Sequence, residues 1–137
     1  MAEGKLLLEI VTPYGLIASE EVDEVTAIGS EGEFGVLPGH VPFVTTLKIG
    51  MLITKADKEA KYFFVNWGYA EIGAEKILVL ADSAERSEEI DLERAKSAMK
   101  RAEERLKKAE DIDFHRAEAA VERATTRIQI AQIRLPR

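Results

Sequence analysis

Hydrophobic and polar residues follow two different periods along this chain of 137 residues. In the first part, short β-branched and aromatic runs recur every 8–12 residues or so, with turn residues between them, which is typical of strands. The predicted strands lie at residues 6–11, 22–28, 41–49, 51–55, 61–67, 69–72 and 76–81. Charged or glycine-containing turns are predicted at 57–59 and 73–75. No helical stretch separates these runs, so we expect a small antiparallel sandwich or barrel rather than a parallel sheet.

From Asp91 onward the spacing of apolar residues changes to three and four, which predicts helices. The first stripe consists of Leu92, Ala95, Met99, Ala102, Leu106 and Ala109. The second stripe consists of Ala117, Val121, Ala124, Ile128, Ala131 and Leu135. The break between the stripes is short, so the two helices should lie antiparallel. Alanine dominates both stripes, and each buried methyl contributes only about 0.8 kcal/mol, so we expect a hairpin of marginal stability.

The distribution of glycine agrees with this division of the chain. All nine glycines lie in the first 73 residues, and the last 47 residues contain none. Residues 1–90 carry 7 Lys/Arg and 16 Asp/Glu, a net charge of −9, whereas residues 91–137 carry 12 and 9, a net charge of +3. An acidic body of this kind argues against nucleic acid as a partner. The chain has no cysteine, which excludes disulfide and thiolate chemistry.

No apolar run approaches the roughly 20 residues that span a bilayer, and we see no secretory signal pattern. The two histidines, His40 and His115, stand far apart in the sequence and share no metal-ligand spacing. No group of residues resembles an acid–base or nucleophilic site. We therefore expect no catalytic residues, no metal site and no independent enzyme activity.

Residues 30–42 form an unusual loop with three glycines, two prolines and the first histidine. The simpler interpretation is a tight connection between strands, in which glycine supplies positive φ and proline fixes φ. The functional interpretation is a rigid loop that presents Glu33 and His40 to a partner. No Gly-Lys-Ser/Thr sequence is present, so this is not a phosphate-binding loop.

Two features of the helical region can carry chemistry. The pattern Ile-Asp-x-x-Arg-Ala occurs at residues 90–95 and again at 112–117, where each aspartate is a candidate helix N-cap. Arginines also form one row on each predicted helix, at positions 94, 101 and 105 and at positions 116, 123, 127 and 134. These arginines either pair with nearby glutamates or are solvated, or the two rows face each other and clamp a polyphosphate.

Over almost its whole length, the chain resembles the epsilon subunits of bacterial rotary F-type ATP synthases. The segment 29–40 resembles that family's signature loop, and residues 81–86 followed by 90–95 resemble its junction into the C-terminal helices. The resemblance implies an α+β fold, with an N-terminal antiparallel β-sandwich at residues 1–86 and a C-terminal antiparallel two-helix hairpin at 87–137. The alternative from the residues alone is a non-catalytic β-domain adaptor with a helical arm, unrelated to a rotary motor.

The resemblance also implies a function. The subunit would belong to the central stalk, where its sandwich docks on the gamma subunit and the c-ring and where Glu33 and His40 match the contact region. It would help couple proton transport to ATP synthesis, at the cytoplasmic face of the bacterial inner membrane. Its hairpin would inhibit ATP hydrolysis by meeting the alpha/beta catalytic head.

In some members of the family the folded hairpin binds ATP as a regulatory ligand, and no cofactor is required. The matching residues in this chain are Glu85, Ile90, Asp91, Arg94, Ala95, Arg101, Arg123 and Arg127.

Overall fold

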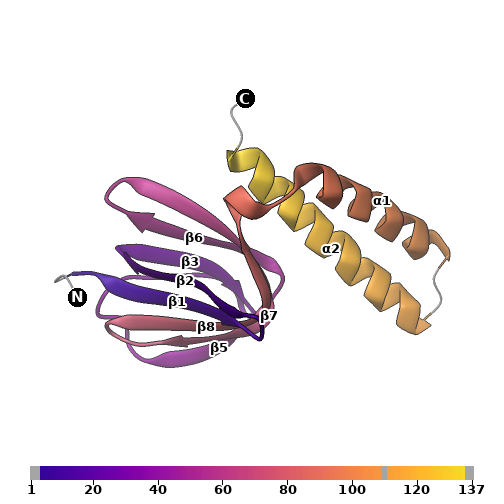
Figure 1. The fold of residues 1–137 in the computed structure, drawn as a ribbon. Coiled ribbons are helices and arrows are strands. Elements are labelled where there is room, and N and C mark those ends of the chain that lie inside the picture. Colours follow the sequence, from indigo (N-terminus) through magenta and orange to yellow (C-terminus); the bar gives the residue numbers. More distant parts are fainter. Residues whose placement is uncertain (1–3, 109–110, 135–137) are drawn as a thin grey trace. The chain divides into compact units, whose positions relative to one another are not determined.

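Eight strands precede the helices in the computed structural model, which describes residues 4–108 and 111–134, with the backbone alone at positions 111, 112 and 134 (Figure 1). The strands are β1 (Leu6–Thr12), β2 (Gly15–Val22), β3 (Glu24–Gly29), β4 (Gly32–Val36), β5 (Phe43–Leu47), β6 (Gly50–Ala56), β7 (Glu59–Ile72) and β8 (Lys76–Arg86). The chain divides into two compact units, Met1–Arg86 and Ser87–Arg137. Strands make up the first unit and helices the second, as the α+β fold class requires.

The strands are hydrogen-bonded in the order β2-β1-β8-β7-β5-β3-β4, while β6 pairs with both β3 and β7. All pairs are antiparallel except β1 and β8, in which Leu8 lies opposite Ile77 in a parallel register. The predicted antiparallel sandwich is therefore confirmed, with this one parallel pair as a departure that the sequence did not predict. A helical crossover is not needed there, because the intervening strands themselves carry the chain back to the side of β1.

The core of the sandwich comes from alternate residues of the strands, because successive side chains of a strand point to opposite faces. In β1 the buried positions are Leu6, Leu8 and Ile10, each fully covered. They pack in one cluster with buried residues of the other strands, including Val25, Leu47, Leu52, Phe63, Ile72, Ile77 and Val79.

The long strand β7 changes direction at Trp67 and Gly68, where φ is 51° and 148°. Before this point β7 pairs with β6, and after it with β5, so the two predicted runs at 61–67 and 69–72 are one bent strand. A Cβ atom at position 68 would lie 2.1 Å from the carbonyl oxygen of Leu80. Only glycine fits this position, both for its φ and for the close approach of β8.

The turn between β6 and β7 consists of Asp57 and Lys58, whose φ angles of 50° and 74° are the positive values that a tight hairpin turn needs. Asp23 holds this turn, since its Oδ2 accepts a hydrogen bond of 2.9 Å from the backbone N–H of Asp57. Lys5 Nζ lies 2.6 Å from Asp23 Oδ1 and 3.1 Å from Asp57 Oδ1. The hydrogen bond from Lys5 lowers the pKa of Asp23, and the bond to Asp23 raises the pKa of Lys5.

Asp23 also explains an error in the predicted strand at 22–28. The structure ends β2 at Val22 and begins β3 at Glu24, so the chain turns at Asp23. The predictions also missed β2 and β4, and ended β8 at Ala81 although it continues to Arg86.

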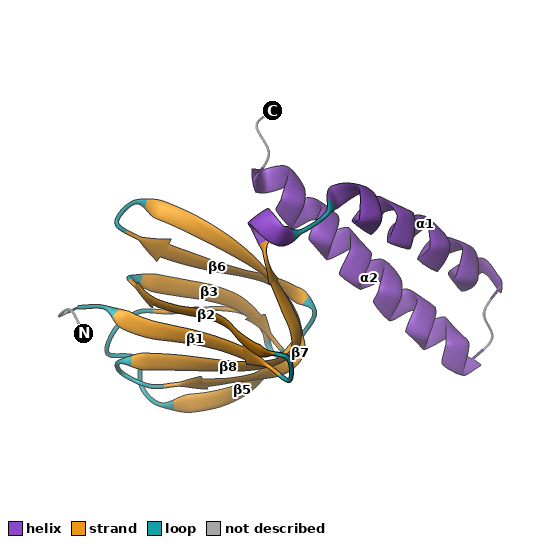
Figure 2. Ribbon diagram, in the orientation of Figure 1, coloured by secondary structure: helices purple, strands orange, loops and turns teal. Residues whose placement is uncertain are grey.

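The second unit begins with a short 3-10 helix, η1 (Ser87–Glu89), followed by α1 (Leu92–Lys108) and α2 (Asp111–Arg134) (Figure 2). The two α-helices lie side by side and antiparallel, as the short break predicted. The predicted stripe alanines Ala95, Ala102, Ala117, Ala124 and Ala131 are at most 4% exposed. Ile130, which the stripes did not include, is fully buried. Ala109 and Leu135 of the predicted stripes lie outside the described residues.

Candidate ligand groove of the hairpin and contact surfaces of the sandwich

The motif at residues 90–95 builds the start of α1. Asp91 caps the helix, because its Oδ1 accepts a hydrogen bond of 3.0 Å from the N–H of Arg94 and its carbonyl accepts one of 3.0 Å from Ala95. Ile90 and Ala95 are each 4% exposed and belong to the packed interior of the unit. Arg94 is exposed. The motif thus combines a cap and two buried anchors with one arginine that faces solvent.

The second copy of the motif is built differently. Helix α2 already begins at Asp111, so Asp113 lies within the helix and is not its N-cap. Ile112, the first residue of this copy, lies outside the residues whose side chains are described.

Members of both arginine rows line one groove in the half of the hairpin that includes the helix connection. This open groove is lined by Arg105 and Lys108 of α1 and by Arg116 and Arg123 of α2. The groove has a volume of about 780 Å³. Of the arginines expected to bind ATP, Arg123 is part of this groove and is half-buried, while Arg101 is exposed and does not line it. Arg127 is half-buried and has an interaction partner of its own. The side chain of Arg134 is not described.

Glu85, the remaining residue of the expected ATP set, belongs to the sandwich unit. It lies in β8 opposite Phe64 of β7, is half-buried and already has an interaction partner.

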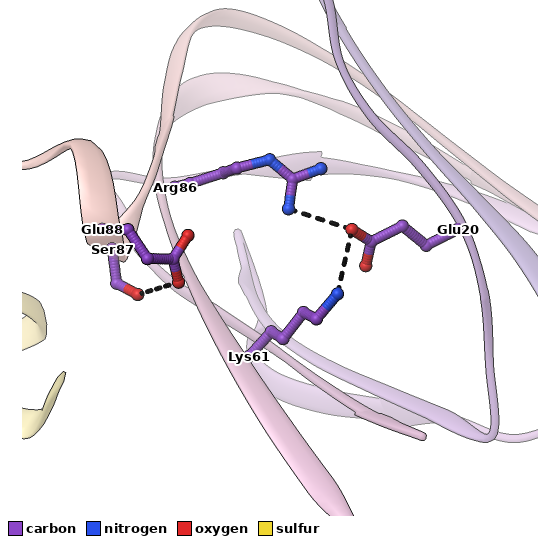
Figure 3. A network of polar contacts seen from close by, with 5 residues as sticks. All are labelled: Glu20, Lys61, Arg86, Ser87 and Glu88. Atoms are coloured by element: carbon purple, nitrogen blue, oxygen red, sulfur yellow. Dashed lines mark hydrogen bonds and ion pairs between the residues drawn. The ribbon is translucent and has the colours of Figure 1, made fainter. Parts of the chain in front are cut away.

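A polar network fixes the last residue of the sandwich (Figure 3). Arg86 Nη1 donates a hydrogen bond of 2.9 Å to Glu20 Oε1, which also accepts one of 3.3 Å from Lys61 Nζ. The guanidinium group of Arg86 lies 5.3 Å from the centre of the Phe63 ring. These contacts join β2, β7 and β8, so the end of β8 is tied to the sandwich up to the residue before the second unit. Sequence reasoning missed Glu20 and Lys61, because no local pattern pairs residues so far apart.

The second unit begins with Ser87, which is buried. Its hydroxyl donates a hydrogen bond of 3.0 Å to Glu88 Oε1, which Figure 3 also shows, and its carbonyl accepts one of 3.3 Å from the N–H of Ile90. These short-range bonds shape the entry into α1.

The loop at residues 30–42 is partly a strand, since β4 pairs with β3 and places the exposed Glu33 opposite Ile28. His40 follows in the connection to β5, with Nδ1 2.6 Å from the carbonyl oxygen of Val41 and its ring 5.4 Å from that of Phe43. The N–H of Gly39 donates a hydrogen bond of 2.8 Å to Ala74, in the turn between β7 and β8. Within the described residues no hydrogen bond or ion pair joins Glu33 to His40, so the loop is ordered but presents the two side chains separately.

One outer face of the sandwich carries an exposed apolar row that the sequence did not reveal. Leu16 of β2 and Leu80 of β8 both lie opposite Val11 of β1, and Tyr69 of β7 lies opposite Leu80. Leu16, Leu80 and Tyr69 are 59%, 47% and 58% exposed. A contiguous apolar surface of this kind marks a protein contact site. The only sequence signal was the apolar residues at positions that strand alternation assigns to the outer face.

Among the described residues, no cluster of His, Asp and Glu side chains could hold a metal ion. A search of the same residues found no helix long and apolar enough to cross a membrane.

Comparison with known proteins assigns both units to one family. Residues 5–87 match the model of the ATP synthase delta/epsilon chain beta-sandwich domain, and residues 88–132 match that of the delta/epsilon chain long alpha-helix domain. The chain is 60% identical over 108 residues to the ATP synthase epsilon chain of Geotalea uraniireducens, covering 79% of this chain and 78% of that one. It is 61% identical over 108 residues to the epsilon chain of Trichlorobacter lovleyi, with the same coverage.

Solved structures show the same fold at lower identity. A chain of the Euglena gracilis mitochondrial ATP synthase superposes with a TM-score of 0.82 at 23% identity, over 97% of this chain and 84% of that one. The adaptor interpretation is therefore set aside: the chain belongs to the family of ATP synthase delta/epsilon chains, among the epsilon chains of bacterial F-type enzymes.

Proposed function

We propose that this chain is a regulatory subunit of the ATP synthase central stalk, whose helical hairpin restrains ATP hydrolysis when it leaves its folded state. One observation carries the proposal. The chain consists of two separately compact units, and each unit matches its own domain of the epsilon family. Such a unit can change its state without unfolding its neighbour.

The sandwich is the docking unit in this proposal. Its outer apolar row, with Leu16, Tyr69 and Leu80, offers the kind of surface that a partner subunit covers. We assign this row to the gamma subunit, and the ordered loop with Glu33 and His40 to the gamma and c-ring contact region. The chain thereby reaches the membrane only through the complex, at its cytoplasmic face, and contributes to the coupling of proton transport to ATP synthesis.

The hairpin is the switching unit. Its two helices meet mainly through alanines, so their separation exposes little buried apolar area to water and costs little free energy. The freed α1 can carry its strongly basic surface, which is already exposed in the folded hairpin, to acidic segments of the alpha/beta catalytic head. Its basic residues are Arg94, Lys96, Lys100, Arg101, Arg105, Lys107 and Lys108.

ATP is the proposed ligand of the folded hairpin, through Ile90, Asp91, Arg94, Ala95, Arg101, Arg123 and Arg127, together with Glu85. A ligand that binds only the folded state stabilises it by about 2.7 kcal/mol at 100 times its Kd. That amount is enough to reverse a balance of a few kcal/mol between two states.

Truncation tests the regulatory role. ATP synthase complexes assembled with the chain ending at Arg86 should contain the subunit in normal amount but hydrolyse ATP faster than complexes with the full chain. Because the network of Glu20, Lys61 and Arg86 stays intact in this truncation, the sandwich should keep its fold. Equal hydrolysis rates in the two complexes, at equal subunit content, would contradict the proposal.

Thermal unfolding of the full chain tests the ligand. Millimolar ATP should raise the unfolding temperature of the wild type and of the control Lys100→Ala, and should have much less effect on Arg94→Ala and Arg123→Ala. Lys100 is exposed on the same helix as Arg94 but lies outside the motif. An identical shift in all four proteins would remove the assigned site, and no shift in any of them would remove the ligand.

A further inference from the structure

The groove near the helix connection is lined by three cations that the proposed ATP set does not include, Arg105, Lys108 and Arg116, and by one that it does, Arg123. Arg105 and Lys108 line one wall, Arg116 and Arg123 line the other, and His115 adds a ring that can donate a hydrogen bond. Asp113 is the one carboxylate among the described lining residues. Within the described part of the chain, no carboxylate forms an ion pair with any of these four cations.

Such an arrangement is electrostatically costly when the groove holds only water. Cations on opposite walls repel each other, and their fields add in the space between the helices. A multivalent anion in that space would attract the cations of both walls, offset their mutual repulsion and accept charge-assisted hydrogen bonds from both walls.

Small side chains in the lining of the groove keep this space open. Its lining includes Ala117, Ala119 and Ala120, whose methyl groups leave room that longer side chains would fill. The volume of about 780 Å³ falls within the roughly 300–1,000 Å³ of small-molecule sites. The groove thus has both the charge and the room for a small polyanion.

The groove adjoins the residues assigned to ATP but extends past them toward the helix connection, because Arg105, Lys108 and Arg116 lie outside that set. Arg105 lies eleven residues beyond Arg94, about 16 Å along a helix that rises about 1.5 Å per residue. Arg123 is the residue shared by the two sets, so a ligand at one site meets the edge of the other.

We propose that the groove at the connection end of the hairpin binds the phosphate chain of a polyphosphate anion, held between Arg105 and Lys108 of α1 and Arg116 and Arg123 of α2. A phosphate chain presents several charged oxygens in a row, which suits cations that project from two opposite walls, and arginine binds such oxygens in pairs. A single monovalent anion cannot engage both walls. The chain can come from free inorganic polyphosphate or from a nucleotide, since both share this chemistry.

Calorimetric titration of the full chain with sodium tripolyphosphate tests the proposal. We expect saturable binding that Lys108→Gln and Arg116→Gln each weaken about five- to tenfold in Kd, as befits the loss of one charged hydrogen-bond donor at a partly exposed site. Lys107→Gln is the matched control. It removes the same charge from the neighbouring position, but a helix turns about 100° per residue and Lys107 does not line the groove. Both Lys108 and Arg116 are exposed, so the variants keep their core.

Several results would overturn the proposal. Equal affinities for Lys107→Gln, Lys108→Gln and Arg116→Gln would show that only net charge matters, and no binding by the wild type would remove the site. Equal affinity for a short oligoglutamate peptide would show that the groove serves acidic protein segments instead.

Further binding measurements identify the source of the phosphate chain and distinguish binding at this groove from the proposed binding of ATP. If the groove takes the chain of a nucleotide, ATP should bind more weakly to Arg116→Gln, whereas AMP should not distinguish this variant from the wild type. Binding of tripolyphosphate that survives in Arg94→Ala supports an independent site, even if ATP fails to stabilise the hairpin. Conversely, if ATP stabilises the chain while Arg116→Gln binds tripolyphosphate normally, the ATP proposal stands and this one fails.

Discussion

Truncating Ile130 tests whether the hairpin is held as loosely as its alanine stripes indicate. Ile130 is fully buried, with an exposed fraction of 0%, whereas the other buried residues in the described parts of the two α-helices are alanines. The five stripe alanines contribute about 0.8 kcal/mol per methyl, or roughly 4 kcal/mol together. Ile130→Ala should cost about 2–5 kcal/mol, the range measured for buried Ile and Leu truncations. One substitution thus removes about as much free energy as the whole alanine seam contributes.

Native-state hydrogen exchange is the appropriate assay, because it resolves local opening from global unfolding. In Ile130→Ala the amides of α1 and α2 should lose most of their protection, while those of β1, β7 and β8 should keep theirs. Leu52→Ala, at a sandwich position that is 1% exposed, is the control and should lower protection in the strands. Helix protection unchanged in Ile130→Ala, or lost equally from strands and helices, would refute the idea of a separately opening hairpin.

Three further predictions concern the sandwich. Gly68→Ala should destabilise it by about 2–5 kcal/mol through the close contact with β8 and the unfavourable φ. In the control Gly73→Ala the added Cβ would lie 3.6 Å from its nearest neighbour, so a urea unfolding curve should show a much smaller loss of stability. The pKa of Asp23 is lowered below its ordinary 3.8, so the stability that its carboxylate contributes is present above that pH and is lost as pH falls through the folded-state pKa. Between neutral pH and about pH 3, the unfolding free energy of Asp23→Asn should therefore depend less steeply on pH than that of the wild type. A steeper dependence would contradict the role of its bond from Lys5. Tyr69→Asp should leave the thermal unfolding temperature nearly unchanged, because Tyr69 is 58% exposed, but should abolish co-purification with the gamma subunit; retention of the complex would remove the outer row from the docking surface.

The errors in the predicted strands have a common physical cause. The strands β2 and β4 lie at the two ends of the strand order, where each has one hydrogen-bonded neighbour. Edge strands are held by pairing to that neighbour and need little burial of their own, so their sequences lack a clear hydrophobic alternation. In β4 two of the five residues are glycine, which made the segment look like a loop. The strand β7 looked like two runs because its bend at Gly68 depends on the close approach of β8.

The candidate site was predictable in its chemistry but not in its geometry. Helical spacing alone placed Arg105 on one side of α1 and Arg116 and Arg123 on one side of α2, and the polyphosphate interpretation followed from these rows. The rotation of each helix about its axis, which decides whether the rows face each other, depends on packing between α1 and α2. That Lys108 and small alanines line the groove was found only in the structure.

The sequence by itself determined the change from strand period to helix period, the cap at Asp91 and the alanine character of the hairpin, because each depends on neighbours within a few residues. Only the tertiary structure decided the parallel pairing of β1 with β8, the bond of Arg86 to Glu20, the exposed row through Leu80 and the groove that members of both basic rows line. These features join residues far apart in the chain, and their free energy exists only once packing has brought the partners together.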